Sequence, residues 1–149
     1  NRAAFDILPL QVNAMAQPDL DNVISLTLTM EGGAMSPRSS SLTDIWGFNG
    51  QSGLNDAPLH SFERGQTARI SMVNDTRFPH GIHLHGHHFF EVQADGVLGA
   101  FRDTTLVNPG ETRDVLCVFD NPGKWLLHCH MLGHQAAGMK NLVGGVVSN

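Results

Sequence analysis

Five side chains within twelve residues of one another combine sulfur and imidazole donors. Cys129 lies between two histidines, in His128-Cys129-His130, and His134 and Met139 follow. Soft sulfur together with imidazole suits copper, and two His, one Cys and a weak axial Met are the ligands of a blue copper site. The spacing therefore predicts a copper site in this part of the chain.

A second cluster of histidines lies about forty residues upstream. Its members are His80, His83, His85, His87 and His88. One blue copper site needs only two imidazoles. The surplus therefore predicts a second metal site.

The alternation of side chains along a strand sorts the downstream cluster onto two faces, because residues two apart share a face. Cys129 shares its face with the apolar Trp125 and Leu127. We therefore expect the thiol to point toward the core. His128 and His130 fall on the opposite face.

The same rule sorts the upstream cluster. His80 shares its face with Ile82 and Leu84, whereas His83 and His85 take the other face. We expect His80 to lie inward beside the thiol. The two His-x-His pairs, each spanning about 6.6 Å of strand, would then meet outside the core at a second metal site.

These motifs resemble those of the C-terminal cupredoxin domain of multicopper oxidases, the family of laccases, bilirubin oxidases and cuprous oxidases. The family pattern His-Pro-x-His-x-His-Gly matches residues 80–86, except that Gly81 replaces the proline. The pattern His-Cys-His-x3-His-x4-Met matches residues 128–139 completely. The resemblance extends from about Asn22 to Val147.

Carried over position by position, the resemblance implies a role for each ligand and four copper ions in the complete assembly. The implied type 1 copper ligands are His80, Cys129, His134 and Met139. The implied type 2 ligand is His83. The implied type 3 ligands are His85, His128 and His130.

The resemblance also implies an oxidase that takes electrons singly from a small reductant, such as a phenol, an amine or a metal ion, and reduces O2 to water. Each electron would pass from type 1 copper through Cys129, His128 and His130, the residues with an implied catalytic role, to a trinuclear cluster. The family builds this cluster from eight histidines, and this chain supplies only the two His-x-His pairs. We therefore expect N-terminal cupredoxin domains with two further His-x-His motifs, on another chain or on a cleaved or missing part of the same polypeptide. Without them the enzyme would be inactive.

Two other kinds of copper domain are alternatives. A pure electron-transfer cupredoxin would hold only type 1 copper and would leave four outward histidines unexplained. A domain like that of copper nitrite reductase also pairs type 1 copper with an interface copper site. Its resemblance fails at the loop after Cys129, where only four residues precede His134, and at the His-Cys-His motif. The six methionines are scattered, which favours phenols or amines over Cu(I) as the reductant.

Composition agrees with a small domain that neither binds nucleic acid nor spans a membrane. A chain of 149 residues can bury one core, and its net charge of −5 offers no basic surface for phosphates. No apolar run approaches the ~18 residues that span a bilayer, so we expect a soluble chain. Two cysteines, one of them a predicted ligand, leave no disulfide framework. An extracytoplasmic location, periplasmic or secreted, is therefore implied by the resemblance alone.

Short strands separated by turn residues predict an all-β fold. Residues 1–21 show no sustained period, so we expect a linker or an extended N-terminal segment before a domain at 22–149. The expected strands are 24–30, 45–50, 68–74, 80–85, 89–92, 104–107, 111–119, 125–129 and 142–147. Residues 131–138 are expected to form a loop or helical turn that carries His134. Strands at this spacing predict a Greek-key β-sandwich, which in this family is of the cupredoxin type.

His87, His88 and Cys117 are not among the implied copper ligands. His87 could support a ligand or could simply pack in the core or at the surface, and His88 has no assigned role. Cys117 shares its face with Val115 and Phe119, which predicts a buried, inert thiol. No acidic residue lies next to the downstream ligands, so proton delivery to oxygen would need another acid or water.

Overall fold

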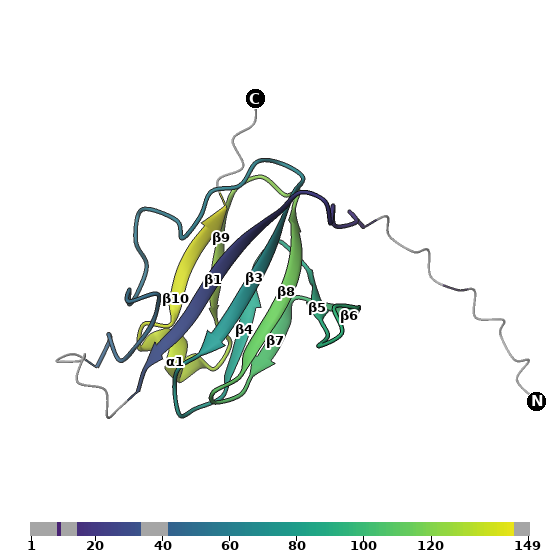
Figure 1. Ribbon diagram of the computed structural model, residues 1–149. Helices are drawn as coiled ribbons and strands as arrows, with labels where there is room; N and C mark the ends of the chain where they lie inside the picture. Colours follow the sequence, from purple (N-terminus) through teal and green to yellow (C-terminus); the bar gives the residue numbers. More distant parts are fainter. Residues whose placement is uncertain (1–8, 10–14, 34–41, 145–149) are drawn as a thin grey trace, which may run out of the picture.

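The computed structural model describes residues 9, 15–33 and 42–144 as a sandwich of two β-sheets with one short helix (Figure 1). The strands of the six-stranded sheet are, in spatial order, β2 (Trp46–Phe48), β1 (Val23–Gly32), β3 (Gln66–Asn74), β8 (Thr112–Phe119), β5 (Phe89–Val92) and β6 (Leu98–Arg102). The strands of the four-stranded sheet are β10 (Lys140–Gly144), β9 (Lys124–Cys129), β4 (His80–Leu84) and β7 (Thr104–Val107). Helix α1 (Leu132–Ala136) follows β9 directly. The predicted all-β sandwich is confirmed.

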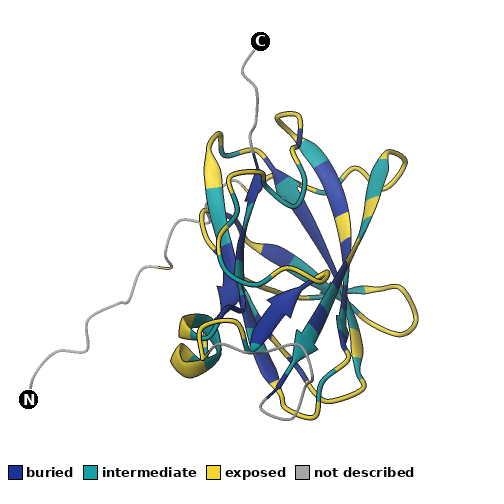
Figure 2. Ribbon diagram, turned by 90° about the vertical axis from the view of Figure 1, so that its left-hand side faces the viewer, coloured by how far each residue is buried: buried dark blue, intermediate teal, exposed yellow. Residues whose placement is uncertain are grey.

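The core lies between the two sheets, and strands such as β1, β3 and β4 bury alternate side chains in it. In β1, Leu28 and Met30 are buried and Thr27 is exposed. Phe48 of β2 and Phe119 of β8 are fully buried as well. Figure 2 shows that the buried residues lie mainly in the strands, whereas α1 has none.

The predicted strands are present, with two differences. Strand β6 was missed because Leu98–Arg102 lies at the edge of its sheet, pairs only with β5 and has no buried residue, so no alternation marks it. Strand β10 begins at Lys140 rather than Leu142, because Lys140 and Asn141 extend the antiparallel ladder with β9. Its predicted end, at residues 145–147, lies outside the described residues.

The pairing of β4 with β9 brings the two histidine motifs together. Their register pairs Ile82 with Cys129 and His83 with His128. Two backbone hydrogen bonds continue this contact beyond the strand ends, from His85 N to Leu126 O (2.9 Å) and from His130 N to Gly81 O (2.6 Å). Paired residues on adjacent strands project to the same side, so this register places two predicted ligands side by side.

The segment expected as a loop or helical turn is short helix α1 with its flanking turns, and it carries His134. Of the segment expected as a linker, residues 15–21 form no strand. They are tied to the domain by the Asp19 N–H, which donates to Thr67 Oγ1 (2.9 Å). In the described ranges no helix is long and apolar enough to cross a membrane.

Candidate metal centres

Three donor atoms from three elements converge inside the sandwich. They belong to His80 of β4, Cys129 at the end of β9 and His134 of α1. Cys129 Sγ lies 3.8 Å from His80 Nδ1 and 3.7 Å from His134 Nδ1, and the two Nδ1 atoms are 3.1 Å apart. His80 and Cys129 are fully buried, as the strand alternation predicted.

The two sulfur–nitrogen separations fit a trigonal site for a first-row metal ion. Metal–nitrogen bonds of about 2.0 Å and a metal–sulfur bond of about 2.3 Å, at roughly 120°, place nitrogen and sulfur about 3.7 Å apart. Both observed sulfur–nitrogen distances are within 0.1 Å of that value. A thiolate with two imidazoles is a donor set that suits copper.

Met139 is held close to this group by the main chain. Its N–H donates to His134 O (3.0 Å), and its carbonyl oxygen accepts from Cys129 N (3.0 Å). The side chain is fully buried. The loop after β9 thus folds back onto Cys129, and the predicted axial residue lies beside the thiol's own backbone.

Burial keeps the imidazoles of this first group in the form that can bind a metal. It lowers the pKa of His80 to about 4, with a further contribution from His134, and it also lowers the pKa of His134. Burial raises the pKa of the Cys129 thiol. Near neutral pH both imidazoles are therefore uncharged and have a nitrogen lone pair for a metal ion, whereas the thiol must release a proton when a metal binds.

A second group of donors forms on the other face of the same strands. His83, His85 and His128 bring ring nitrogens within 4.8 Å of one another. His85 Nε2 and His128 Nε2 are 3.0 Å apart. The predicted division of the histidines between two faces therefore holds for these three residues.

Two backbone carbonyls select the nitrogens that face this second group. His83 Nδ1 lies 3.0 Å from Asp103 O, and His128 Nδ1 lies 3.0 Å from Cys129 O. Because a carbonyl oxygen only accepts, both Nδ1 atoms carry the proton and both Nε2 atoms keep the lone pair. The first group thus brings Nδ1 atoms together, whereas His83 and His128 offer Nε2 atoms to the second group.

His130 lies at the margin of the second group. Its ring centroid is 5.5 Å from that of His83 and 5.9 Å from that of His128, and its side chain is exposed. Its donor atom is not among the three that converge. His130 follows the last residue of β9, but its N–H still donates to Gly81 O (2.6 Å) and its ring stacks on that of His128, so it lies on the predicted outward side.

Residues that the motifs did not reveal support His83. Thr104 Oγ1 lies 2.9 Å from His83 Nδ1, and Asp103 Oδ2 lies 3.9 Å from it. A hydrogen bond from the Thr104 hydroxyl holds the pKa of Asp103 below its ordinary value. Asp103 directly precedes β7 and Thr104 begins it, and the pairing of Thr104 with His83 is the information that the sequence lacked.

The other residues singled out in the sequence lie outside both groups. His87 is buried, and its ring packs 4.8 Å from Phe119 and 5.8 Å from Trp125. Burial lowers the pKa of His87. Cys117 is fully buried, and burial raises the pKa of its thiol, so the predicted buried thiol is confirmed.

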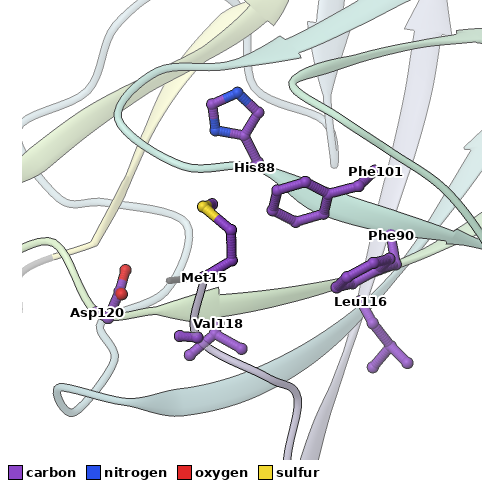
Figure 3. Close-up of a pocket in the computed structure, with 8 residues that line it drawn as sticks. Met15, His88, Phe90, Phe101, Leu116, Val118 and Asp120 are labelled. Atoms are coloured by element: carbon purple, nitrogen blue, oxygen red, sulfur yellow. The ribbon is translucent and has the colours of Figure 1, made fainter. Parts of the chain in front are cut away.

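His88 belongs to a different surface. Its exposed ring stacks on Phe101, with centroids 5.3 Å apart. Both residues line a small cavity of about 30 Å³ on the six-stranded sheet, together with Met15 and Asp120 (Figure 3). That volume is about enough for one water molecule, and the cavity shares no residue with either donor group.

Known proteins place this chain in a family. The family model described as multicopper oxidase matches residues 19–143. The multicopper oxidase MmcO of Mycobacterium tuberculosis is 44% identical over 94 residues, which cover 63% of this chain and 18% of that protein. Laccase-1 of Botryotinia fuckeliana is 30% identical over 146 residues, which cover 82% of this chain and 26% of that protein.

Solved structures agree. The crystal structure of Lac15, from a marine microbial metagenome, is 59% identical, with a TM-score of 0.64 over 94% of this chain and 31% of that one. A multicopper oxidase of Pseudomonas thermotolerans is 27% identical, with a TM-score of 0.77 over 94% of this chain and 33% of that one. The predicted cupredoxin-type fold is thereby confirmed.

The chain spans between 18% and 33% of the length of these four proteins. Copper is the metal of the matched family, and the first donor group has the distances that such an ion requires. The match covers most of the chain and includes both histidine motifs. The chain belongs to the multicopper oxidase family.

Proposed function

We propose that residues 22–149 are the C-terminal cupredoxin domain of an oxidase that takes electrons singly from a small reductant and reduces O2 to water. One observation carries this proposal. Two donor groups lie on opposite faces of β4 and β9, and they are joined by the peptide between His128 and Cys129. A protein that only transfers electrons has no use for the second group.

The proposed assignment follows the two groups. The type 1 copper ligands are His80, Cys129, His134 and Met139. The type 2 ligand is His83. The type 3 ligands are His85, His128 and His130. The convergence of the donors supports this assignment for six of the residues, and the family pattern supports it for Met139 and His130.

The protein's own contribution is to hold ligands and to exclude water. Copper, when bound, would supply one-electron oxidation and reduction. Cys129 and His128 are adjacent in sequence and point to opposite faces, so an electron path through them stays within covalent bonds. Full burial of Cys129 keeps water away from the thiolate. The Asp103 and Cys129 carbonyls hold His83 and His128 with Nε2 toward the second group.

The second group is incomplete in this chain. Three converging histidines and His130 at their margin cannot hold three copper ions, because each ion needs two or three imidazoles. The missing donors would come from N-terminal cupredoxin domains with two further His-x-His motifs, on another chain or on another part of the same polypeptide. The small share of the relatives' length that this chain spans supports this view.

The substrate class follows from similarity only. Relatives include laccases and proteins named copper resistance protein A, so we propose a small reductant such as a phenol, an amine or a metal ion. An extracytoplasmic location is part of the same proposal.

Copper stoichiometry and oxygen consumption test the proposal. The 149-residue chain loaded with copper should bind one ion at the first group, show an intense blue thiolate-to-copper band and consume no oxygen. Together with domains that supply the missing histidines, it should bind four ions and oxidise a phenol. Four copper ions and oxygen consumption by this chain alone would contradict the shared cluster. A single blue copper, even with those domains present, would favour an electron-transfer cupredoxin.

A further inference from the structure

We propose that Thr76, oriented by Asn74, is a positioning residue that fixes which ring nitrogen of His80 carries the proton and so leaves Nδ1 free for copper. Both residues lie upstream of the histidine motif, Asn74 at the end of β3 and Thr76 in the turn between β3 and β4. It rests on the proposed copper site at His80. It follows from counting donors and acceptors around one hydroxyl group.

The orientation of the Asn74 side chain is the first step. Asn74 ends β3 and is almost completely buried. Its Nδ2 donates to Phe78 O (2.8 Å) and to Val107 O (3.0 Å). Both partners are carbonyl oxygens, which only accept, so the amide nitrogen must occupy that side. Asn74 Oδ1 therefore points the other way.

The second step concerns the Thr76 hydroxyl. Asn74 Oδ1 accepts from Thr76 N (3.0 Å) and from Thr76 Oγ1 (2.7 Å). Phe78 O lies 3.0 Å from the same hydroxyl and is also only an acceptor. A hydroxyl has one proton. Whichever of the two oxygens receives it, none remains for another neighbour.

The third step concerns the hydrogen bond between the Thr76 hydroxyl and the His80 imidazole. Thr76 Oγ1 lies 2.8 Å from His80 Nε2. Since the hydroxyl proton is already used, Oγ1 can only accept from that nitrogen, and His80 Nε2 must carry a proton. The Phe78 N–H, 3.2 Å away, supplies the other donor to Oγ1. The hydroxyl then donates once and accepts twice, which is its full capacity.

The consequence falls on the other ring nitrogen. A neutral imidazole has one N–H, and full burial disfavours the charged form of His80. Nδ1 therefore keeps its lone pair, and it faces Cys129 Sγ and His134 Nδ1. Asn74 and Thr76 thus prepare His80 as a ligand before any metal binds.

The wild-type chain without metal gives the first test. Nitrogen-15 NMR of the His80 ring distinguishes a protonated from an unprotonated nitrogen without any copper. We expect one tautomer, with the proton on Nε2. A proton on Nδ1 would overturn the proposal, whatever any variant does.

Variants give the second test. Thr76→Val keeps the side-chain shape but removes the hydroxyl, so a second tautomer should appear. The dissociation constant for Co(II), whose thiolate band reports the site without oxidising Cys129, should rise about 10- to 100-fold, as is typical when a residue that supports a ligand is lost. Thr76→Ser, which retains the hydroxyl, should restore both the single tautomer and the affinity.

Thr67→Val is the matched control. Thr67 is buried whereas Thr76 is half-buried, and the Thr67 hydroxyl accepts from Asp19 N, which belongs to neither donor group. This variant should keep the His80 tautomer and the Co(II) affinity even if it loses stability. A Thr76→Val chain that retains either wild-type property would refute the positioning role. Failure of the wild-type chain to bind metal would instead count against the proposed function, because the tautomer is measured without metal.

Discussion

Gly138 is a sensitive point of the proposed copper site, although it is not a ligand. It lies between α1 and Met139, with a φ of +112°. A Cβ atom at this position would overlap the Ser52 hydroxyl and would lie 2.5 Å from Trp46 O. The hydroxyl can rotate away, but the Trp46 carbonyl cannot, because Trp46 N donates to Ala137 O (2.9 Å) and ties β2 to the same loop.

Two costs determine the expected effect of Gly138→Ala: backbone strain at positive φ and steric overlap of the added methyl group. Placing a non-glycine residue in this part of φ/ψ space costs about 1 to 3 kcal/mol, and forcing a methyl group into a filled site costs about 1 to 3 kcal/mol. We therefore expect a loss of about 2 to 6 kcal/mol in the free energy of unfolding. The loop should also shift, which would displace Met139 from Cys129 and weaken the blue band of the copper-loaded chain.

Urea unfolding of the metal-free chain and the visible spectrum of the copper-loaded chain measure these effects. Gly133→Ala is the matched control, because Gly133 lies in α1 next to His134, has no positive φ and has no atom within 4 Å of an added Cβ. It should change stability by less than about 1 kcal/mol, in the stabilising direction. Equal stabilities and spectra for the two variants would refute the close approach of Gly138 to β2.

Three other predictions concern the donor groups. Met139→Leu removes a weak thioether donor that favours Cu(II), so the type 1 reduction potential should rise, and potentiometry showing an unchanged or lower value would count against axial ligation. Cys129→Ser should abolish the blue band in absorption spectra. The double variant His128→Ala, His130→Ala should retain this band but stop oxygen uptake by the complete assembly. Loss of the band in a folded double variant would overturn the assignment of the ligands to two faces. In the metal-free chain the pKa of His80 is lowered from 6.5 to about 4. Between these two pH values the unfolded state binds more protons than the folded state. The free energy of unfolding should therefore fall by about 3 kcal/mol as the pH is lowered from 6.5 to 4. Urea unfolding from pH 7 to pH 4 measures this loss, and a flat profile would contradict the buried neutral imidazole.

The division of the ligands between two faces could be predicted from sequence because it depends on a local property. Side chains alternate along any strand, so the apolar neighbours of Cys129 and His80 were enough to place both inward. The same reasoning placed His83, His85 and His128 outward. The alternation of Leu28 and Met30 with polar residues likewise revealed β1.

The sequence was less informative where no alternation or periodic spacing exists. Strand β6 lies at a sheet edge without buried residues, so its pairing with β5 alone defines it. The pairing of Thr104 with His83 is likewise absent from the motifs. A local rule has no information about either feature.

Tertiary structure decided which nitrogen of His80 and of His83 faces a metal, whereas the partner of His128 is the carbonyl of the next residue. That choice depends on hydrogen-bond partners from other elements: the carbonyl of Asp103 at the start of β7 for His83, and the Thr76 hydroxyl in the turn after β3 for His80. The Asn74 amide is oriented by Phe78 O, four residues away in the chain, and by Val107 O, 33 residues away. Motif spacing identifies ligands by residue type, whereas the proton on the His83 ring is set by a carbonyl that only the pairing of β4 with β7 brings near.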